Sequence, residues 1–202
     1  MSELVPGAYP IVLSAGRPVS SSRLWAIPVF GILVKAILLI PHAIILYVLG
    51  LVVGISHLVI WIAVLFGGRY PDWGFGLNAG YLRWVTRVTL YIYGITDAYP
   101  SFNMEAPGDI SISRPESSSR FFAIPLIGIL VKGILLIPHG IILYVLGFVV
   151  ALCQVVIWIP VLFTGHYPEW AFSLVAGTTL WAMRIYAYGL GLTDRYPPFS
   201  FS

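Results

Sequence analysis

The sequence predicts an all-α integral membrane protein built from two tandem repeats. Hydrophobic residues make up 59% of the 202-residue chain and charged residues only 9%, whereas soluble domains carry about 25% charged residues. A chain this apolar cannot hide its surplus hydrophobic surface in a core of this size, because much of its surface must face water. A lipid bilayer removes that conflict.

The second observation is a duplication. The apolar run 37–50 recurs as 134–147, and both copies contain Leu-Leu-Ile-Pro-His. The offset is 120 − 23 = 97, which takes Arg23 onto Arg120, and it continues without a gap to Phe102 and Phe199. We therefore divide the chain into an N-terminal arm (1–22), a first membrane repeat (23–102), a linker and second arm (103–119), and a second membrane repeat (120–202).

The arm before each repeat has a short extended pattern. Residues 9–14 are mostly apolar, and residues 109–115 alternate apolar and polar side chains as a strand does. We expect these segments to lie outside the membrane and to pair as a short β ribbon.

The first helix of each repeat is predicted at 24–40 and 121–137. A serine run precedes each one, and serine can cap the free amides at a helix start. Lys35 and Lys132 lie near the helix ends, and lysine is costly at the bilayer centre but tolerated near the headgroups. These helices are therefore expected to be interfacial or tilted, with the lysines as candidate contacts for lipid or another anion.

Pro41 and Pro138 are expected to kink or break the helix, because proline disfavours helical backbone at the residue before it. Spanning helices are then predicted at 41–66 and 138–163. The first contains 26 residues without a formal charge, about 39 Å of helix against a hydrocarbon core of about 30 Å.

A third membrane helix is predicted at 74–95 and 171–192, after a corner rich in glycine, proline and tryptophan. It carries an equivalent arginine in each copy, and a closing turn with an aspartate follows. We expect ion pairs between these groups, or alternatively an arginine that contacts a lipid phosphate or an anionic substrate. The residues are Arg87 with Asp97 and Arg184 with Asp194.

The topology follows from the charges, which the two repeats place alike. An odd number of crossings per repeat would invert the second copy, against the bias of basic residues toward the cytoplasm. Two crossings per repeat, four in all, are therefore predicted, which makes a multi-pass protein of the cell (inner or plasma) membrane. A hairpin folded near residues 50–54 is the competing layout.

Three motifs resemble a bacterial family of small membrane proteins that is catalogued only as a domain of unknown function. They are Ile-Pro-His at 40–42 and 137–139, Gly-Arg-Tyr-Pro at 68–71, and Thr-Asp-x-Tyr-Pro-x-Phe at 96–102 and 193–199. The second repeat departs from the middle motif, with His166 in place of Arg69. The resemblance implies a prokaryotic membrane protein and no particular reaction.

His42 and His139 are the residues most suited to bind a cofactor. Equivalent histidines in paired repeats could meet and ligate a haem iron or a metal. The favoured interpretation is structural: each histidine satisfies carbonyl groups that the neighbouring proline frees. No cofactor or metal is therefore predicted, with haem or metal binding kept as the alternative.

The sequence offers no nucleophile with an adjacent base, no phosphate loop and no basic stripe suited to nucleic acid. The predicted function is a non-enzymatic membrane scaffold or accessory subunit. Its expected partners are lipids, other transmembrane subunits or a second copy of the chain. The alternative is a small transporter or channel with Arg87 and Arg184 in an anion path.

Overall fold

The computed structural model describes residues 9–27, 29–106 and 110–201. Within them the chain forms four α-helices, a short 3-10 helix and two short strands. Their order is β1 (Ile11–Leu13), α1 (Phe30–Gly67), α2 (Asp72–Ile92), β2 (Ile110–Ile112), η1 (Phe121–Ala123), α3 (Ile127–Thr164) and α4 (Glu169–Gly189).

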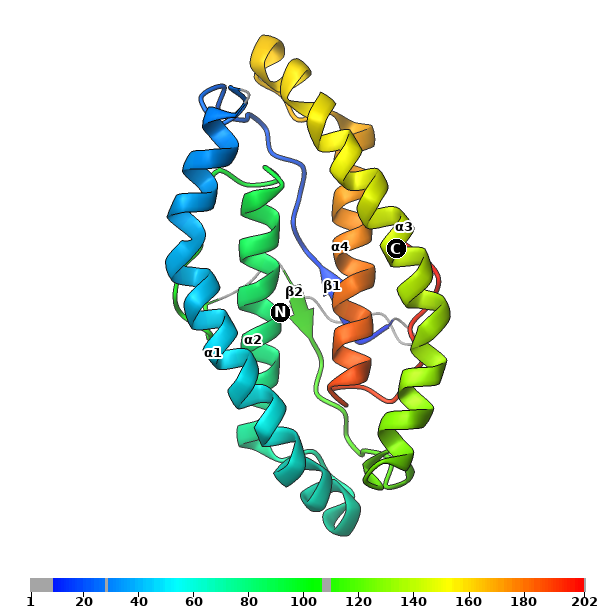
Figure 1. Cartoon of the computed structure of the whole chain (residues 1–202). Coiled ribbons are helices and arrows are strands. Elements are labelled where there is room, and N and C mark those ends of the chain that lie inside the picture. The colour runs from blue at the N-terminus through cyan, green and yellow to red at the C-terminus, as the bar shows by residue number, and fades with distance from the viewer. Residues whose placement is uncertain (1–8, 28, 107–109, 202) are drawn as a thin grey trace.

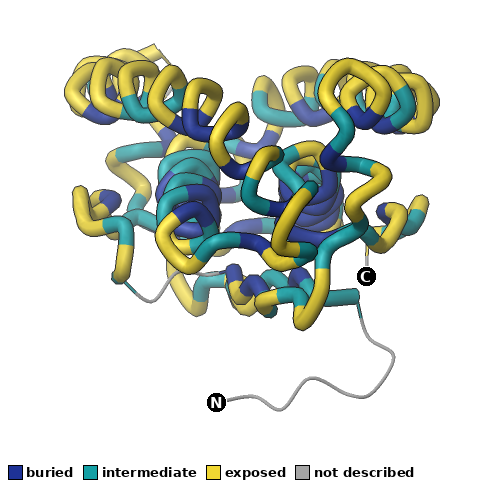
Figure 2. The backbone as a smooth tube through the Cα atoms, turned by 90° about the horizontal axis from the view of Figure 1, so that it is seen from below, coloured by how far each residue is buried: buried dark blue, intermediate teal, exposed yellow. Residues whose placement is uncertain are grey.

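The elements form three layers. The two long helices α1 and α3 make one outer layer and run in opposite directions (Figure 1). Helices α2 and α4 lie beneath them, and the strands lie on the far side, where β1 contacts α4 and β2 contacts α2 (Figure 2). An approximate two-fold axis perpendicular to the layers therefore relates the repeats.

Each long helix is continuous, so the predicted break at Pro41 and Pro138 is wrong. Both prolines lie inside 38-residue helices. An internal proline has no N–H for the carbonyl four residues before it, which here is that of Ile37 or Ile134, and a tyrosine of the closing turn bonds the next carbonyl along the helix. The Tyr99 hydroxyl donates to Leu38 O at 2.8 Å, and the corresponding hydroxyl in repeat two donates at 2.9 Å. The separate interfacial and spanning helices of the prediction are thus single helices.

The long helices also start later than the predicted residues 24 and 121. Residues 24–27 form turns, and η1 occupies the equivalent place in the second repeat. A sharp return of the chain precedes each helix, and it brings a backbone carbonyl against the first turn. A Cβ on Gly31 would overlap the Trp25 carbonyl oxygen, and a Cβ on Gly128 would overlap that of Phe122. Only glycine fits these positions without a shift of the backbone.

The predicted ribbon and third helices are present. Strands β1 and β2 pair antiparallel, with Ile11 opposite Ile112. The predicted second arm begins at Asp109, which lies outside the described residues. The third helices α2 and α4 start two residues before the predicted 74 and 171 and end three residues before the predicted 95 and 192.

The core lies between the layers, whereas the outer face of α1 and α3 is apolar and exposed. Between Lys35 and Arg69, and from Lys132 to the end of α3, no Asp, Glu, Lys or Arg occurs. Among the described helices, α1 and α3 are long and apolar enough to cross a membrane. We call their exposed surface the outer face. Its exposed members include Ile37, Ile40, Ile44, Val48, Leu51, Ile55, Leu58 and Ile62 of α1 and Ile134, Ile137, Ile141, Val145, Phe148, Leu152, Val155 and Ile159 of α3.

Candidate functional site

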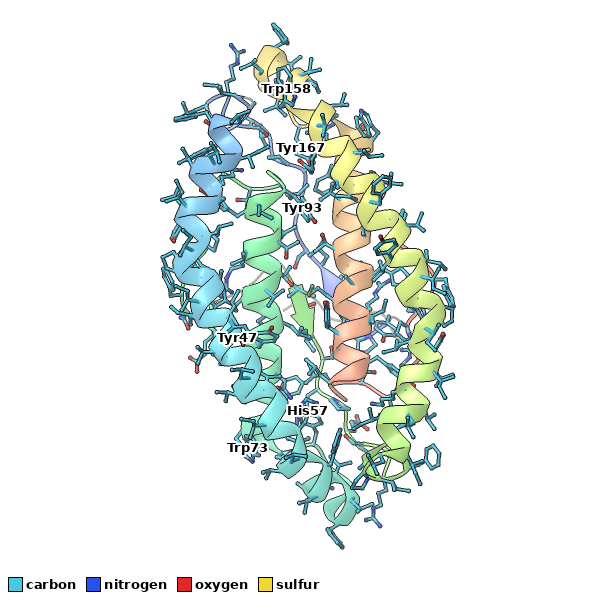
Figure 3. All side chains as sticks on the ribbon, viewed as in Figure 1. Tyr47, His57, Trp73, Tyr93, Trp158 and Tyr167 are labelled. Carbon is cyan, nitrogen blue, oxygen red and sulfur yellow. The ribbon has the colours of Figure 1, made fainter. Side chains whose placement is uncertain are left out.

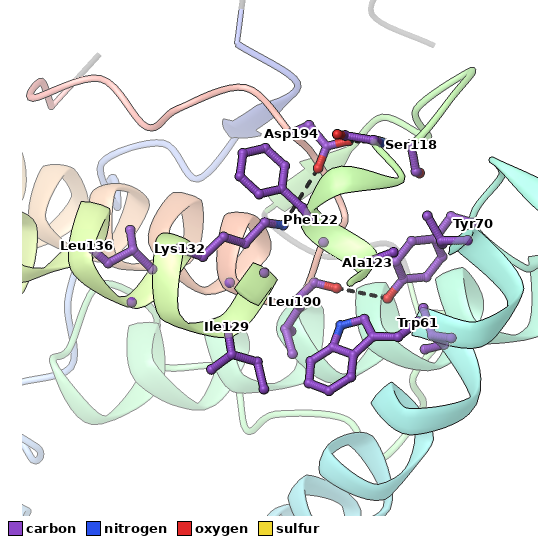
Figure 4. Close-up of a pocket in the computed structure, with 17 residues that line it drawn as sticks. Trp61, Tyr70, Ser118, Phe122, Ala123, Ile129, Lys132, Leu136, Leu190 and Asp194 are labelled. Atoms are coloured by element: carbon purple, nitrogen blue, oxygen red, sulfur yellow. Dashed lines mark hydrogen bonds and ion pairs between the residues drawn. The ribbon is translucent and has the colours of Figure 1, made fainter. Parts of the chain in front are cut away.

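Two pockets of similar size lie where the repeats meet, and each combines the start of one long helix with the end of the other. The first pocket has a volume of about 230 Å³ and the second about 250 Å³. Equivalent residues line both, so the two-fold axis relates them. The first, which we call pocket A, is lined by Lys132, Asp194 and Ser118 with Trp61 of the other repeat (Figure 4). The second, pocket B, is lined by the counterparts Lys35, Asp97, Ser21 and Trp158.

A buried lysine lies at the polar end of each pocket. Lys35 Nζ donates to Tyr91 O and Lys132 Nζ donates to Tyr188 O, both at 2.9 Å. These carbonyls belong to the last turns of α2 and α4, where the helix dipole favours a cation. The ammonium groups also lie 4.8 Å from the Tyr91 and Tyr188 ring centroids, and such cation–π contacts strengthen when desolvated. The lysines therefore point from the outer layer into the protein.

The aspartates of the closing turns complete the polar end, but they do not form the predicted ion pairs with the arginines. Asp97 Oδ2 accepts a hydrogen bond from Ser22 N, and Asp194 Oδ2 accepts one from Ser119 N, both at 2.6 Å. Asp194 also forms an ion pair with Lys132 at 3.6 Å. The predicted arginine pairs are wrong because the closing turn carries its aspartate to the lysine side of the third helix.

The serine runs lie at the pockets and do not cap the long helices. Neither α1 nor α3 has a side-chain hydrogen bond at its N-cap. Ser21 and Ser118 instead line pockets B and A, and their hydroxyl oxygens are buried and without a hydrogen-bond partner among the described residues. An unpaired buried hydroxyl costs about 1–3 kcal/mol. The two equivalent unpaired hydroxyls are therefore the polar groups of these pockets that most need a hydrogen-bond partner.

Tyrosines tie the two repeats together beside the pockets. Tyr70 donates to Leu190 O at 3.0 Å, and Tyr167 donates to Tyr93 O at 3.1 Å. Tyr167 and Tyr93 come together near one end of the molecule, next to Trp158 (Figure 3). Burial raises the pKa of both phenols, Tyr70 and Tyr167, to about 12. They therefore remain protonated donors at neutral pH.

The closing motif Thr-Asp-x-Tyr-Pro-x-Phe ties the end of each repeat to its long helix. Its aspartate and its tyrosine make the hydrogen bonds described above, and its phenylalanine stacks on the histidine of α1 or α3. The ring centroids of His42 and Phe102 are 4.0 Å apart, and those of His139 and Phe199 are 3.9 Å apart. The aspartate, the tyrosine and the phenylalanine of the motif thus each have a structural contact in both repeats.

The histidines that could bind haem or metal are fully buried, each within its own repeat. His42 Nδ1 accepts a hydrogen bond from Trp84 Nε1, and His139 Nδ1 accepts one from Trp181 Nε1, both at 2.9 Å. This acceptor role places the ring proton on Nε2. Nε2 has no hydrogen-bond partner among the described residues, so the expected bonds from the histidines to carbonyls freed by the prolines are wrong. In the described part of the chain, His, Cys, Asp and Glu side chains form no group of three that could hold a metal. Haem or metal binding stays a prediction.

The arginines that could form an anion path contact backbone carbonyls on the opposite side of α2 and α4. Arg87 donates to Asn103 O at 2.5 Å and to Ala106 O at 3.2 Å. Arg184 donates to Ile11 O and Ser200 O, both at 3.4 Å. These bonds hold the segments that follow α2 and α4, and Arg184 also holds β1. The geometry gives the anion path no particular support, and it remains untested.

Comparison with known families identifies the repeats. The profile described as "Domain of unknown function (DUF4389)" matches residues 31–104 and 127–200. The chain belongs to the DUF4389 family. The two matches confirm the predicted duplication and the resemblance to a domain of unknown function. No curated protein and no solved structure matches the chain.

The DUF4389 segments contain the lysines, the histidines and the closing motifs, while the serines of the pockets precede each match. Each pocket therefore combines one DUF4389 repeat, the arm before it and the end of the other repeat's long helix. Sequence reasoning missed this arrangement. The Tyr-Pro that follows each long helix, at 70–71 and 167–168, is repeated at the same offset. That repetition was a signal for Tyr70 and Tyr167, but nothing local indicates that their partners lie in the other repeat.

Proposed function

We propose that this DUF4389 protein is a non-enzymatic membrane scaffold that lies in one leaflet of a bilayer. The long helices α1 and α3 are embedded parallel to the membrane plane, with their outer face toward the hydrocarbon. Helices α2 and α4 lie at headgroup depth, and the β ribbon lies in water. This arrangement replaces the four crossings expected from the sequence.

The exposed outer face is the observation that carries the proposal. Within the most apolar 18-residue window, only 17% of α1 and 11% of α3 is buried inside the molecule. Monomeric soluble proteins rarely expose apolar patches larger than a few hundred Å², and this face extends over two helices of 38 residues. A lipid surface is the partner of matching chemistry, because the only formal charge in each helix is a lysine that is buried inside the protein.

Length argues against a simple crossing. A helix of 38 residues extends for about 57 Å at 1.5 Å per residue, while the hydrocarbon core is about 30 Å thick. A crossing would also place the β ribbon beside the middle of the helices, inside the hydrocarbon (Figure 1). The two-stranded ribbon has open edges, and lipid cannot satisfy the hydrogen bonds of open edges.

Symmetry supports the same orientation. With α1 and α3 in the membrane plane, the two-fold axis coincides with the membrane normal. Equivalent charged groups then lie at the same depth on the same side, as the shared charge pattern of the repeats requires. In a crossing orientation the same axis would lie in the membrane plane, and each charged group would face its counterpart across the bilayer.

The direct test is vesicle flotation. We expect the purified protein, moved from detergent into phosphatidylcholine vesicles, to float with the vesicles and to stay bound in high salt, because apolar contact is not screened. Soluble protein in high salt would contradict embedding. Protein that stays bound to the vesicles in high salt but is cut by added protease within the β ribbon would agree with embedding.

A further inference from the structure

We infer that pockets A and B each bind one anionic phospholipid, with the headgroup phosphate at the lysine and serine and an acyl chain running out between α1 and α3. This inference rests on the proposed membrane embedding. It goes beyond it by assigning two specific lipid sites, separate from the general contact of the outer face with the bilayer.

The polar end of each pocket supplies hydrogen-bond donors for phosphate. The Lys132 ammonium has three N–H groups, one of which bonds Tyr188 O. The Ser118 hydroxyl lines the same pocket, buried and without a partner among the described residues. A phosphate oxygen accepts from both kinds of donor. The same pair recurs in pocket B, where Ser21 is 9% exposed, so the unpaired hydroxyl is a repeated feature of the fold.

The charge balance favours an anionic headgroup. Pocket A contains Lys132 and Asp194, and Arg120 lies next to the pocket-lining serines. A Cβ on Gly68 would come within 3.3 Å of Arg120 Nε, and Arg23 lies similarly close to Gly165 beside pocket B. Two basic groups and one acidic group leave a net positive charge at the polar end of each pocket.

The rest of each pocket suits an acyl chain. In pocket A, Ile129 of α3 lies beside Trp61 of α1 (Figure 4), and Leu136 of α3 lines the same pocket. These residues belong to the long helices, so the apolar wall is continuous with the layer that contacts the bilayer. In the proposed orientation the lysine and serine lie at headgroup depth and the apolar wall lies at chain depth. A phospholipid of the surrounding leaflet therefore fits without being inverted.

The chain offers a matched pair of substitutions that fill the pockets. Gly133 lines pocket A and its counterpart Ala36 lines pocket B. A Cβ on Gly133 would meet nothing within 4 Å, and a larger side chain is preferred over glycine inside a helix. Gly140, also in α3, is equally open but lines neither pocket. Gly133→Phe and Ala36→Phe therefore fill one pocket each, and Gly140→Phe is the control.

The experiment counts retained lipids by native mass spectrometry. Protein is reconstituted in vesicles of phosphatidylglycerol and phosphatidylcholine in equal amounts, then extracted in mild detergent. We expect two phosphatidylglycerol molecules per chain in the wild type and in Gly140→Phe, one in each single pocket variant, and none in the double variant. Flotation of every variant should be unchanged, because each substitution adds an apolar side chain and no charge to the long helices.

Other outcomes overturn the inference. A wild type that floats but retains no lipid, or a double variant that still retains two, would remove the pockets as lipid sites while leaving membrane embedding intact. Equal retention of phosphatidylcholine would overturn the anionic preference. Loss of flotation in the wild type would instead contradict the proposed function.

Discussion

Replacement of Ile44 and Ile141 together by aspartate is expected to weaken membrane partitioning by about 10⁴- to 10⁵-fold, since each charge in hydrocarbon costs about 2.5–3.5 kcal/mol. The two positions are equivalent and lie in the middle of the outer face, 60% and 62% exposed. Because both side chains already point away from the protein, the fold should be unaffected. Partition coefficients from vesicle flotation measure the effect.

The control places the same charge on the water side. Ser111 lies in β2 and its side chain is exposed, so Ser111→Asp should leave the partition coefficient unchanged. If the double aspartate variant partitioned like the wild type, the outer face would not contact hydrocarbon. Far-UV circular dichroism of each variant in detergent separates loss of binding from loss of fold.

The largest effect on stability is expected at the tryptophans that hold the histidines. Trp84 and Trp181 are 4% and 5% exposed, and replacing a buried tryptophan by alanine lowers the free energy of unfolding by about 3–5 kcal/mol. Trp84→Phe keeps most of the volume but leaves His42 Nδ1 without its donor, which costs about 1–3 kcal/mol. Denaturant unfolding in detergent micelles is the measurement.

Trp73→Ala is the matched control for Trp84→Ala, because Trp73 is 52% exposed. This substitution should lower the free energy of unfolding by less than about 1 kcal/mol, as substitutions away from buried features do. Similar losses of unfolding free energy in Trp73→Ala and Trp84→Ala would contradict a structural role for the contacts between tryptophan and histidine. Trp181→Ala should match Trp84→Ala, because the two-fold axis makes their surroundings equivalent.

Sequence reasoning succeeded where a feature depends on local pattern or on repetition. The duplication, the β ribbon and the third helices were predicted from the shared offset, the alternation and the glycine and proline punctuation. It failed at Pro41, where the helix continues and Tyr99 bonds the carbonyl of Leu38 from 61 positions away in the sequence. It failed at Asp97 for a similar reason: the donor Ser22 N is 75 residues away.

The pockets could not be predicted from the sequence, for a different reason. Each depends on how one repeat packs against the other, which places the start of α1 beside the end of α3. Tyr70 and Tyr167 fix this packing through carbonyls of the opposite repeat. No pattern within one repeat specifies such contacts. The membrane orientation likewise depends on which faces of α1 and α3 remain uncovered after the repeats have assembled.

The central claim is that the two-fold axis runs along the membrane normal, and sided cysteine labelling tests it. Cys153 is the single cysteine of the chain and corresponds to Ser56 of the first repeat, so Cys153→Ser gives a conservative background. The label is a membrane-impermeant maleimide added to sealed vesicles. Positions for new cysteines must be exposed and must mark both ends of the long helices.

Four exposed positions meet these conditions: Ser20, Arg69, Ser117 and His166. Ser20 precedes a residue bonded to the end of α3, and Ser117 precedes one bonded to the end of α1. If α1 and α3 lie in one leaflet, cysteines at all four positions react from the same side of the membrane. Reaction of the Ser20 and His166 variants from one side, with the Ser117 and Arg69 variants from the other, would show that the long helices cross the bilayer.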